Sequence, residues 1–320
     1  MTKYTSFMKD TIYEYIKNKK ASNCWNESYE KYLRTFENYC SNNYPGHKKL
    51  NQDMVDSWCA KRNTENNKSC SSRICVVISF LKYTNARNIT NLNIPTQPKV
   101  EKRKYIPHFF TQEELLNFFY ACDHIELKKN NLVSKNQQLT VPVFFRLLYS
   151  TGMRPTEARL LKVEDVNLDE GIINIKKSKG YNQHYVVLND LIKEHLVQYD
   201  KQINKLYKNR TYFFPTRNNG YHKRQWVSVN FKNNWELYNN SHAIPYDLRH
   251  NYAIMNINSW INKGIEFHEK LYYLSKSMGH SSIEATKYYY SLIPRMSDIF
   301  KNQINTSFDI IVPGVSCDEQ

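Results

Sequence analysis

Apolar and aromatic residues recur at intervals of three and four over the first hundred residues. Such spacing places them on one face of a helix and predicts a series of short helices. The first two sets are Tyr4, Phe7, Met8, Ile12, Tyr15 and Ile16, followed by Tyr29, Tyr32, Leu33, Phe36 and Tyr39. Two further helices are predicted at about 52–60, after a turn around Pro45 and Gly46, and at about 71–83. Together these elements predict a small helical bundle.

The apolar spacing stops in the segment 95–107, where prolines and cations take its place. The segment holds Pro95, Pro98 and Pro107 together with Lys99, Lys102, Arg103 and Lys104. A proline-rich, charged stretch of this kind is typical of an extended linker. The expected organisation is therefore a helical domain at 1–94, a basic linker at 95–107, a second domain at 108–306 and a C-terminal tail at 307–320.

The second domain is predicted to begin with a helix, because Thr111 and Glu114 have the spacing of a capping box. A buried helix at about 141–149 follows. Two β-rich runs at 171–176 and 185–188 then flank a polar turn and predict a hairpin. Helical spacing returns in the segments 190–206, 225–237, 246–262, 267–278 and 282–290. The predicted fold class is mainly α with a small β-hairpin, followed by a short β-like run at 308–312 in the tail.

Charge is distributed unevenly along the chain. The whole sequence carries 45 Lys and Arg against 30 Asp and Glu, a net charge of +15. Residues 1–105 hold 19 of these cations and 9 of the anions, so two-thirds of the excess lies on the first third of the chain. A concentrated positive charge of this kind is the electrostatic footprint of a protein that binds nucleic acid, although a merely basic soluble surface gives the same count.

Several classes of protein are disfavoured by what the sequence lacks. Its longest apolar stretches, at 75–81 and 141–149, fall well short of the roughly 20 residues of a membrane span. Charged residues interrupt the first twenty positions, which argues against a signal peptide and favours the cytoplasm. Seven cysteines without a C-x-x-C pair fit a reducing compartment. No H-x-x-x-H pair and no glycine-rich phosphate loop occurs, so neither a metal nor a cofactor is expected.

Four separated fragments of the second domain carry the candidate chemistry. They are LYSTGMRPTEARLL at 148–161, Ser178-Lys179-Gly180 with YVVL at 185–188, PYDLRHNYA at 245–253 and MGHSSIEATKYYY at 278–290. These fragments resemble the conserved boxes of the tyrosine recombinases, also called phage integrases. The first is similar to G-[LM]-R-x-x-E, the third to H-x-L-R-H-x-[FY]-A and the fourth to L-G-H-S-S-I-x-T-T-x-x-Y. All four follow one another in the order of that family.

The resemblance implies a set of site residues. They are Arg154, Lys179, Tyr246, Arg249, His280 and Tyr289. An arginine that follows a glycine turn at a helix start can direct its planar donors outward, and Glu157 one turn later can hold the guanidinium, although a solvated arginine has the same spacing. A lysine at a hairpin tip can reach a DNA groove and either donate a proton or only contact phosphate.

One position departs from the family pattern. Tyr246 stands where the family usually has histidine, and a tyrosine there can still hydrogen-bond a phosphate oxygen. His250, the residue after Arg249, points about 100° away from it on a helix and is expected to pack inside the fold. The nucleophile implied by the spacing is Tyr289, nine positions after His280, with Tyr288 on one side and Tyr290 on the other.

The resemblance also implies an activity and an architecture. Tyr289 would attack a DNA phosphodiester and form a 3′-phosphotyrosyl link without a metal, with two arginines stabilising the developing charge. Lys179 would protonate the departing 5′ oxygen, and His280 would assist proton transfer or orient the phosphate. A SAM-like core-binding bundle and the catalytic domain would clamp double-stranded DNA. The expected partners are DNA, further copies of the chain in a tetramer on synapsed DNA, and an accessory directionality factor, with no membrane.

Two alternatives remain open at this point. A type IB topoisomerase or telomere resolvase shares the tyrosine and arginine chemistry but acts alone on DNA. A DNA-binding regulator on a catalytically degenerate recombinase fold is the second alternative, and Tyr246 is the residue that favours it. The chain length and the G-H-S-S-I box favour a site-specific recombinase over the first alternative, and covalent trapping of DNA would separate it from the second.

Overall fold

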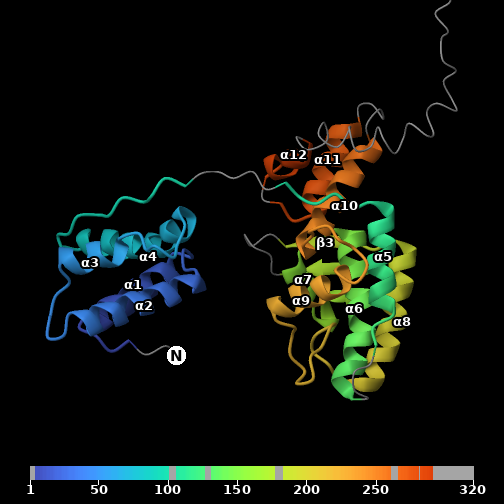
Figure 1. Cartoon of the computed structure of the whole chain (residues 1–320), viewed down its shortest axis with the longest axis horizontal. Coiled ribbons are helices and arrows are strands. Elements are labelled where there is room, and N and C mark those ends of the chain that lie inside the picture. Colours follow the sequence, from blue (N-terminus) through green and yellow to red (C-terminus); the bar gives the residue numbers. More distant parts are fainter. Residues whose placement is uncertain are drawn as a thin grey trace, which may run out of the picture. The chain divides into compact units, whose positions relative to one another are not determined.

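The computed structural model describes residues 4–100, 106–126, 131–176, 183–260, 266–280 and 282–290 of the chain. The chain forms two compact units, Met1–Tyr105 and Ile106–Gln320 (Figure 1). Lys179, the middle of the predicted linker at 101–105 and the predicted tail at 307–320 lie outside the described residues.

The first unit is a bundle of four helices. They are α1 (Lys9–Ala21), α2 (Glu27–Asn43), α3 (Gln52–Cys59) and α4 (Asn67–Asn85). Asparagine caps three of them: the side chains of Asn26, Asn51 and Asn66 accept hydrogen bonds from backbone N–H groups in the first turns of α2, α3 and α4. These caps satisfy donors that the helix itself leaves without a partner. The local sequence therefore sets where each of these helices begins.

The apolar faces predicted from the sequence form the core of the first unit. Tyr15, Phe36 and Phe80 are all buried, and the rings of Tyr15 and Phe80 lie 5.4 Å apart in an edge-to-face contact. Helix α1 starts at Lys9, later than the apolar spacing suggested, but Tyr4 is nevertheless buried in this core. The predicted small helical bundle is confirmed.

One charged side chain lies inside this bundle. Arg73 of α4 is 4% exposed, and its guanidinium pairs with the Glu65 carboxylate while donating to the carbonyl oxygens of Trp58 and Ala60. Hydrogen bonds from Arg73 hold the pKa of Glu65 at about 2. The buried cation is therefore neutralised within the unit.

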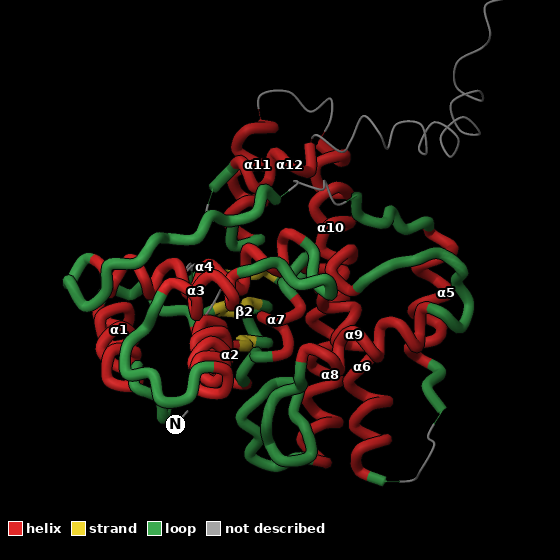
Figure 2. The backbone as a smooth tube through the Cα atoms, turned by 60° about the vertical axis from the view of Figure 1, so that its left-hand side comes forward, coloured by secondary structure: helices red, strands yellow, loops and turns green. Residues whose placement is uncertain are grey.

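The second unit is mostly helical and also contains a small sheet (Figure 2). Its helices are α5 (Gln112–Asp123), α6 (Leu132–Thr151), α7 (Pro155–Arg159), α8 (Asp190–Leu206), α9 (Arg224–Trp235), α10 (Pro245–Trp260), α11 (Glu266–Ser277) and α12 (Glu284–Tyr290), and its strands are β1 (Val166–Asn167), β2 (Ile172–Ile175) and β3 (His184–Val187). The predicted fold class, mainly α with a small β element, is confirmed.

The sheet is larger than the predicted hairpin. Its order is β1-β2-β3, with both pairs antiparallel, so that Ile173 pairs with Val166 on one side and Val186 on the other. The added strand β1 is only two residues long, which leaves no alternation of polar and apolar residues to detect. The capping box at Thr111 and Glu114 is present in the structure.

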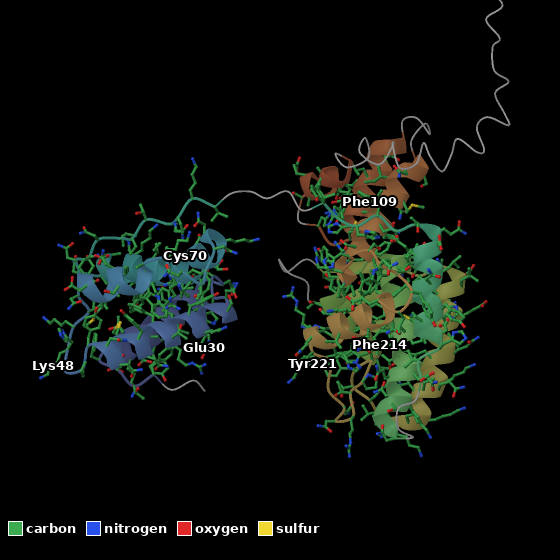
Figure 3. The ribbon with its side chains drawn as sticks, viewed as in Figure 1. Glu30, Lys48, Cys70, Phe109, Phe214 and Tyr221 are labelled. Atoms are coloured by element: carbon green, nitrogen blue, oxygen red, sulfur yellow. The ribbon has the colours of Figure 1, made fainter. Side chains whose placement is uncertain are left out.

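Helix α6 runs through the middle of the second unit and is longer than predicted. It begins at Leu132, where the side chain of Asn131 accepts a hydrogen bond from the backbone N–H of Ser134, and continues through Pro142 to Thr151. The side chains of Phe144 and Phe145 on this helix are fully buried. The ring of Phe144 lies 5.3 Å from the ring of Phe214, which is labelled within the second unit in Figure 3. This core holds the elements that carry the first arginine box.

A second, smaller core joins the last three helices. Its members are Ala253, Ile254, Ile257, Leu271, Leu274, Met278 and Tyr289. Phe109, labelled in Figure 3, packs against this cluster from the segment before α5. Tyr289 is thus anchored through packing on α10 and α11. None of the helices in the described ranges combines the length and the apolar character that crossing a membrane requires.

Candidate active site

Arg154 is held at the junction between α6 and α7. Helix α6 ends at Gly152, whose φ of +63° is a left-handed conformation that favours glycine. The backbone N–H of Arg154 donates to Glu157 Oε2 at 2.9 Å, and its Nη1 donates to Oε1 of the same carboxylate at 2.6 Å. Nη2 donates to the carbonyl oxygen of Gly279 at 2.8 Å. The predicted support of Arg154 by Glu157 is confirmed.

Arg249 lies deeper, on α10, and is 1% exposed. Its Nη1 donates to the carbonyl oxygen of Gly152 at 2.6 Å, and its Nη2 donates to the carbonyl oxygen of Met278 at 2.6 Å. Burial lowers the pKa of Arg249, with the nearby Arg154 cation acting in the same direction. Among the described residues Nε has no hydrogen-bond partner, so one donor remains for a further group.

His280 lies between Arg249 and helix α12. Arg249 Nη2 is 3.0 Å from His280 Nε2, and a guanidinium can only donate, so Nε2 accepts. The proton of the neutral ring is then assigned to Nδ1, which lies 2.7 Å from Thr286 Oγ1 and donates to it. Burial lowers the pKa of His280 to about 4, assisted by the cations of Arg249 and Arg154. Near neutral pH His280 is therefore an uncharged ring that uses both nitrogens.

Tyr289 on α12 faces the same group of residues. Its ring is nearly parallel to the His280 ring, at 14° and with 6.1 Å between ring centroids, and it lies 5.4 Å from the ring of His250. The side chain is 3% exposed. Burial raises the pKa of Tyr289 to about 12, and the cation of Arg249 opposes that rise. The phenol is protonated near neutral pH and must lose its proton before or during any attack.

Tyr246 lies at the start of α10 and is 39% exposed. Together with Arg154 it lines a cavity of about 820 Å³ between α7, α9 and the start of α10. Arg159, Arg224 and Lys232 also line this cavity, together with Glu157 and Glu236, so cations outnumber anions in its lining. Such a surface suits a polyanion.

The structure brings five of the six predicted site residues into one region. Arg154 and Arg249 share the segment Met278–Gly279, Arg249 bonds to His280, and the ring of Tyr289 stacks on the ring of His280. Tyr246 joins this group through the ring of His250, which contacts the rings of both Tyr246 and Tyr289. The sixth residue, Lys179, lies outside the described residues.

Other residues of this region were not predicted from the sequence. Thr286 accepts from His280, and His184 of β3 lies directly against Gly279. A Cβ at Gly279, where φ is +61°, would come within 2.5 Å of the His184 ring. The glycine in the G-H-S-S-I box was the available signal, because a glycine before a functional residue often permits a close approach. Nothing in the local sequence indicated which side chain would approach it.

Comparisons with known proteins agree on the class to which this chain belongs. The profile of the phage integrase family matches residues 108–295. The tyrosine recombinase XerD of Rickettsia bellii (strain RML369-C) is 25% identical over 281 residues, covering 82% of this chain and 86% of that protein. The match to the family profile spans more than half of the chain. The chain therefore belongs to the phage integrase family, the tyrosine recombinases.

Solved structures show the same fold. The XerH site-specific recombinase bound to a palindromic difH substrate, in a post-cleavage complex, superposes with a TM-score of 0.58 at 18% identity, covering 85% of this chain and 78% of that one. A lambda integrase tetramer bound to a Holliday junction gives a TM-score of 0.58 at 14% identity, covering 88% and 76%. Family and fold together identify a site-specific recombinase, an enzyme that breaks and rejoins DNA strands.

Proposed function

We propose that Tyr289 is the nucleophile of this recombinase and that Arg154 and Arg249 bind the scissile phosphate. In the proposed step the Tyr289 oxygen attacks the phosphorus, a bond between phosphorus and the phenol oxygen forms, and the bond to the 5′ oxygen breaks. The phenol gives up its proton and the departing 5′ oxygen gains one. The link retains the energy of the phosphodiester, so a 5′ hydroxyl of another strand reverses the step without ATP.

The observation that carries this proposal is the environment of Arg249. It is a fully buried cation held by two carbonyl oxygens and a neutral imidazole, and no carboxylate of the described residues lies within ion-pair distance of it. A buried charge without a counter-ion is unfavourable unless another group supplies the opposite charge. A phosphate next to Tyr289 supplies it, and its charge increases as the phenol attacks.

The remaining candidates take roles that follow from their surroundings. His280 orients Arg249, because both of its nitrogens are engaged and its pKa is lowered to about 4. Tyr246, which lines the cavity beside Arg154, donates a hydrogen bond from its hydroxyl to a phosphate oxygen in place of the family's histidine. Lys179 protonates the departing 5′ oxygen, as the resemblance of the hairpin box implies.

The larger assembly is proposed by analogy with the solved complexes. The helical domain at 1–94 and the catalytic domain at 108–306 would hold double-stranded DNA, with the linker at 95–107 crossing its backbone. A tetramer would form on synapsed sites, because the lambda integrase structure is a tetramer on a Holliday junction. The tail at 307–320 would dock on a neighbouring protomer of the tetramer. An accessory factor would set the direction of recombination.

Covalent trapping on a nicked suicide substrate tests the nucleophile. The substrate carries the genomic junction next to the gene, and the product is detected as a protein–DNA band on a denaturing gel. We expect Tyr289→Phe to lose the band completely, while Tyr288→Phe and Tyr290→Phe retain it. A band from Tyr289→Phe, together with its loss in Tyr288→Phe or Tyr290→Phe, would assign the nucleophile to a different tyrosine.

The same substrate separates the alternative activities. A type IB topoisomerase would relax supercoiled plasmid that lacks the junction, whereas a recombinase acts only on junction-bearing DNA. A DNA-binding regulator would shift the junction on a native gel and form no covalent band. Wild-type protein that behaves in either way would contradict the proposed function.

A further inference from the structure

His250 occupies a position between the two tyrosines of the candidate site. It follows Tyr246 by one helical turn on α10, and the two rings meet edge to face at 5.0 Å with an interplanar angle of 67°. Residues four apart on a helix lie on the same face, so this contact follows directly from the sequence spacing. Tyr246 is 39% exposed, whereas His250 is 8% exposed beneath it.

The same imidazole also contacts the nucleophile helix. The ring of His250 lies 5.4 Å from the ring of Tyr289 at 54°, and 6.4 Å from the ring of Tyr288. Burial lowers the pKa of His250 to about 4, and the cation of Arg249 acts in the same direction. His250 is therefore neutral near pH 7 and packs as an aromatic ring, adding no charge beside Arg249.

The tyrosine at position 246 creates a need for such support. A phenol is longer than the imidazole that the family usually has there, and its hydroxyl lies at the end of a side chain with two rotatable bonds. Without a lateral contact, a half-exposed tyrosine samples several rotamers and places its hydroxyl at the phosphate only part of the time. An edge-to-face aromatic contact restricts the ring without using its hydroxyl.

We propose that His250 is a positioning residue that holds the Tyr246 hydroxyl towards the phosphate and the Tyr289 ring against Arg249. One aromatic ring thus aligns the residue that replaces the family's histidine with the nucleophile. This inference rests on the proposed function, in which both tyrosines act on one phosphate. In this role His250 acts through its contacts with the two tyrosines and not on the phosphate itself.

The first test compares variants that keep or remove the ring. His250→Phe retains an aromatic ring, His250→Leu fills the space without one, and His250→Ala removes both ring and volume. In the full chain we expect His250→Leu and His250→Ala to slow single-turnover cleavage on the order of 10- to 100-fold, the scale of a small misplacement of reacting groups. His250→Phe should stay within about threefold of wild type, and all three should bind the junction with unchanged Kd.

The second test asks whether His250 acts through the Tyr246 hydroxyl. Tyr246→Phe keeps the ring and removes the oxygen that His250 is proposed to place. In that background His250→Leu should slow cleavage less than it does in wild type, because only its effect on Tyr289 remains. A residue needed only for folding would give the same factor in both backgrounds. Equal factors would therefore overturn the proposal, as would equal activity of His250→Leu and His250→Phe.

A second tyrosine–histidine pair in the chain provides the control. Tyr120 and His124 have the same spacing at the end of α5, and their rings stack at 4.0 Å. His124→Leu should leave cleavage unchanged. If wild-type protein cleaves and His250→Leu is as fast, the inference fails while the proposed function stands; if wild-type protein forms no covalent complex, both fail.

Discussion

Among the described residues, the most deeply buried arginine of each unit is stabilised in a different way. Arg73 in the helical bundle and Arg249 in the second unit are 4% and 1% exposed. Burial alone would lower the pKa of either group, but the Glu65 carboxylate raises that of Arg73, whereas the pKa of Arg249 is lowered. Arg73 has its counter-ion within the fold. Arg249 has only neutral acceptors among the described residues.

Under the proposed function, Arg73 is a structural charge and Arg249 is a charge that binds the substrate. A protein that only needs to pack an arginine places a carboxylate beside it, as Glu65 is placed beside Arg73. Arg154 keeps a carboxylate partner in Glu157, whereas none of the described carboxylates pairs with Arg249, so the proposed phosphate would supply its counter-charge. Carbonyl oxygens hold the guanidinium of Arg249 in place and leave its net charge available.

The largest effect on stability is expected where the neutralised pair is broken. Glu65→Ala leaves Arg73 buried without its counter-ion and should lower the free energy of unfolding by about 3–5 kcal/mol. Denaturant unfolding of the full chain, followed by a probe in the helical bundle, measures the change. A loss below about 1 kcal/mol would show that water reaches Arg73 and that the two arginines are alike.

Removal of the other arginine should affect catalysis instead. Arg249→Ala is expected to lower the cleavage rate on the order of 10²- to 10³-fold, because a donor to the developing negative charge is lost. Binding of the junction should change by only a few-fold, since many other cations contact DNA. Parallel gel-shift and single-turnover cleavage assays measure both, with Arg146→Ala on the exposed side of α6 as the control. An equal loss of binding and cleavage would place Arg249 in the general binding surface.

Mild acid should weaken the second unit before the first. Burial holds the pKa of His222, His250 and His280 at about 4, below the usual 6.5. Between these values the unfolded chain binds protons that the folded chain does not, so stability is full above pH 6.5 and falls as the pH drops, by about 1.4 kcal/mol per unit for each histidine. Glu65, with its pKa lowered from 4.5 to about 2, loses its contribution only below pH 4.5.

Unfolding curves at pH 7 and pH 5 test this expectation with one probe in each unit. The probe in the second unit should report the larger loss, and His222→Phe should reduce it because one of the three titrating groups is gone. Equal losses in the two units would show that these histidines ionise freely in the folded chain.

The smallest effect is expected at a surface ion pair. Arg146 and Asp123 form a two-pronged pair at 2.7 Å, but the side chains are 25% and 43% exposed. Asp123→Ala should therefore lower the free energy of unfolding by less than about 1 kcal/mol. A loss as large as that of Glu65→Ala would mean that burial is not what distinguishes these arginines.

Local signals in the sequence predicted many of the elements. The helix predicted at 190–206 is α8 (Asp190–Leu206), and the spacing at 52–60 and 282–290 closely matches α3 and α12. Helix α6 was predicted too short, because the apolar residues concentrate after position 141 and Pro142 normally favours a helix start. The strand β1 was missed, because it forms only by pairing with β2.

The site residues were predicted as a list, without their contacts. The family-like boxes indicated Arg154, Arg249, His280 and Tyr289 together, and all four lie in one region of the structure. The bond from Arg154 to the carbonyl of Gly279 joins residues 125 positions apart, and no local pattern encodes such a bond. The role inferred for His250 likewise depends on the placement of α12 beside α10.

Two glycines whose carbonyl groups hold the arginines should also appear among inactivating mutations. Gly152 and Gly279 end α6 and α11 in left-handed conformations, and their oxygens accept from Arg249 and Arg154 respectively. A Cβ at Gly152 would meet the ring of Tyr252 at 2.3 Å, so even alanine must displace that ring. An unbiased selection for inactive alleles should therefore recover both glycines alongside the arginines. Neither glycine has a side chain that could contact DNA, so their recovery would show that activity needs the backbone that supports the two arginines.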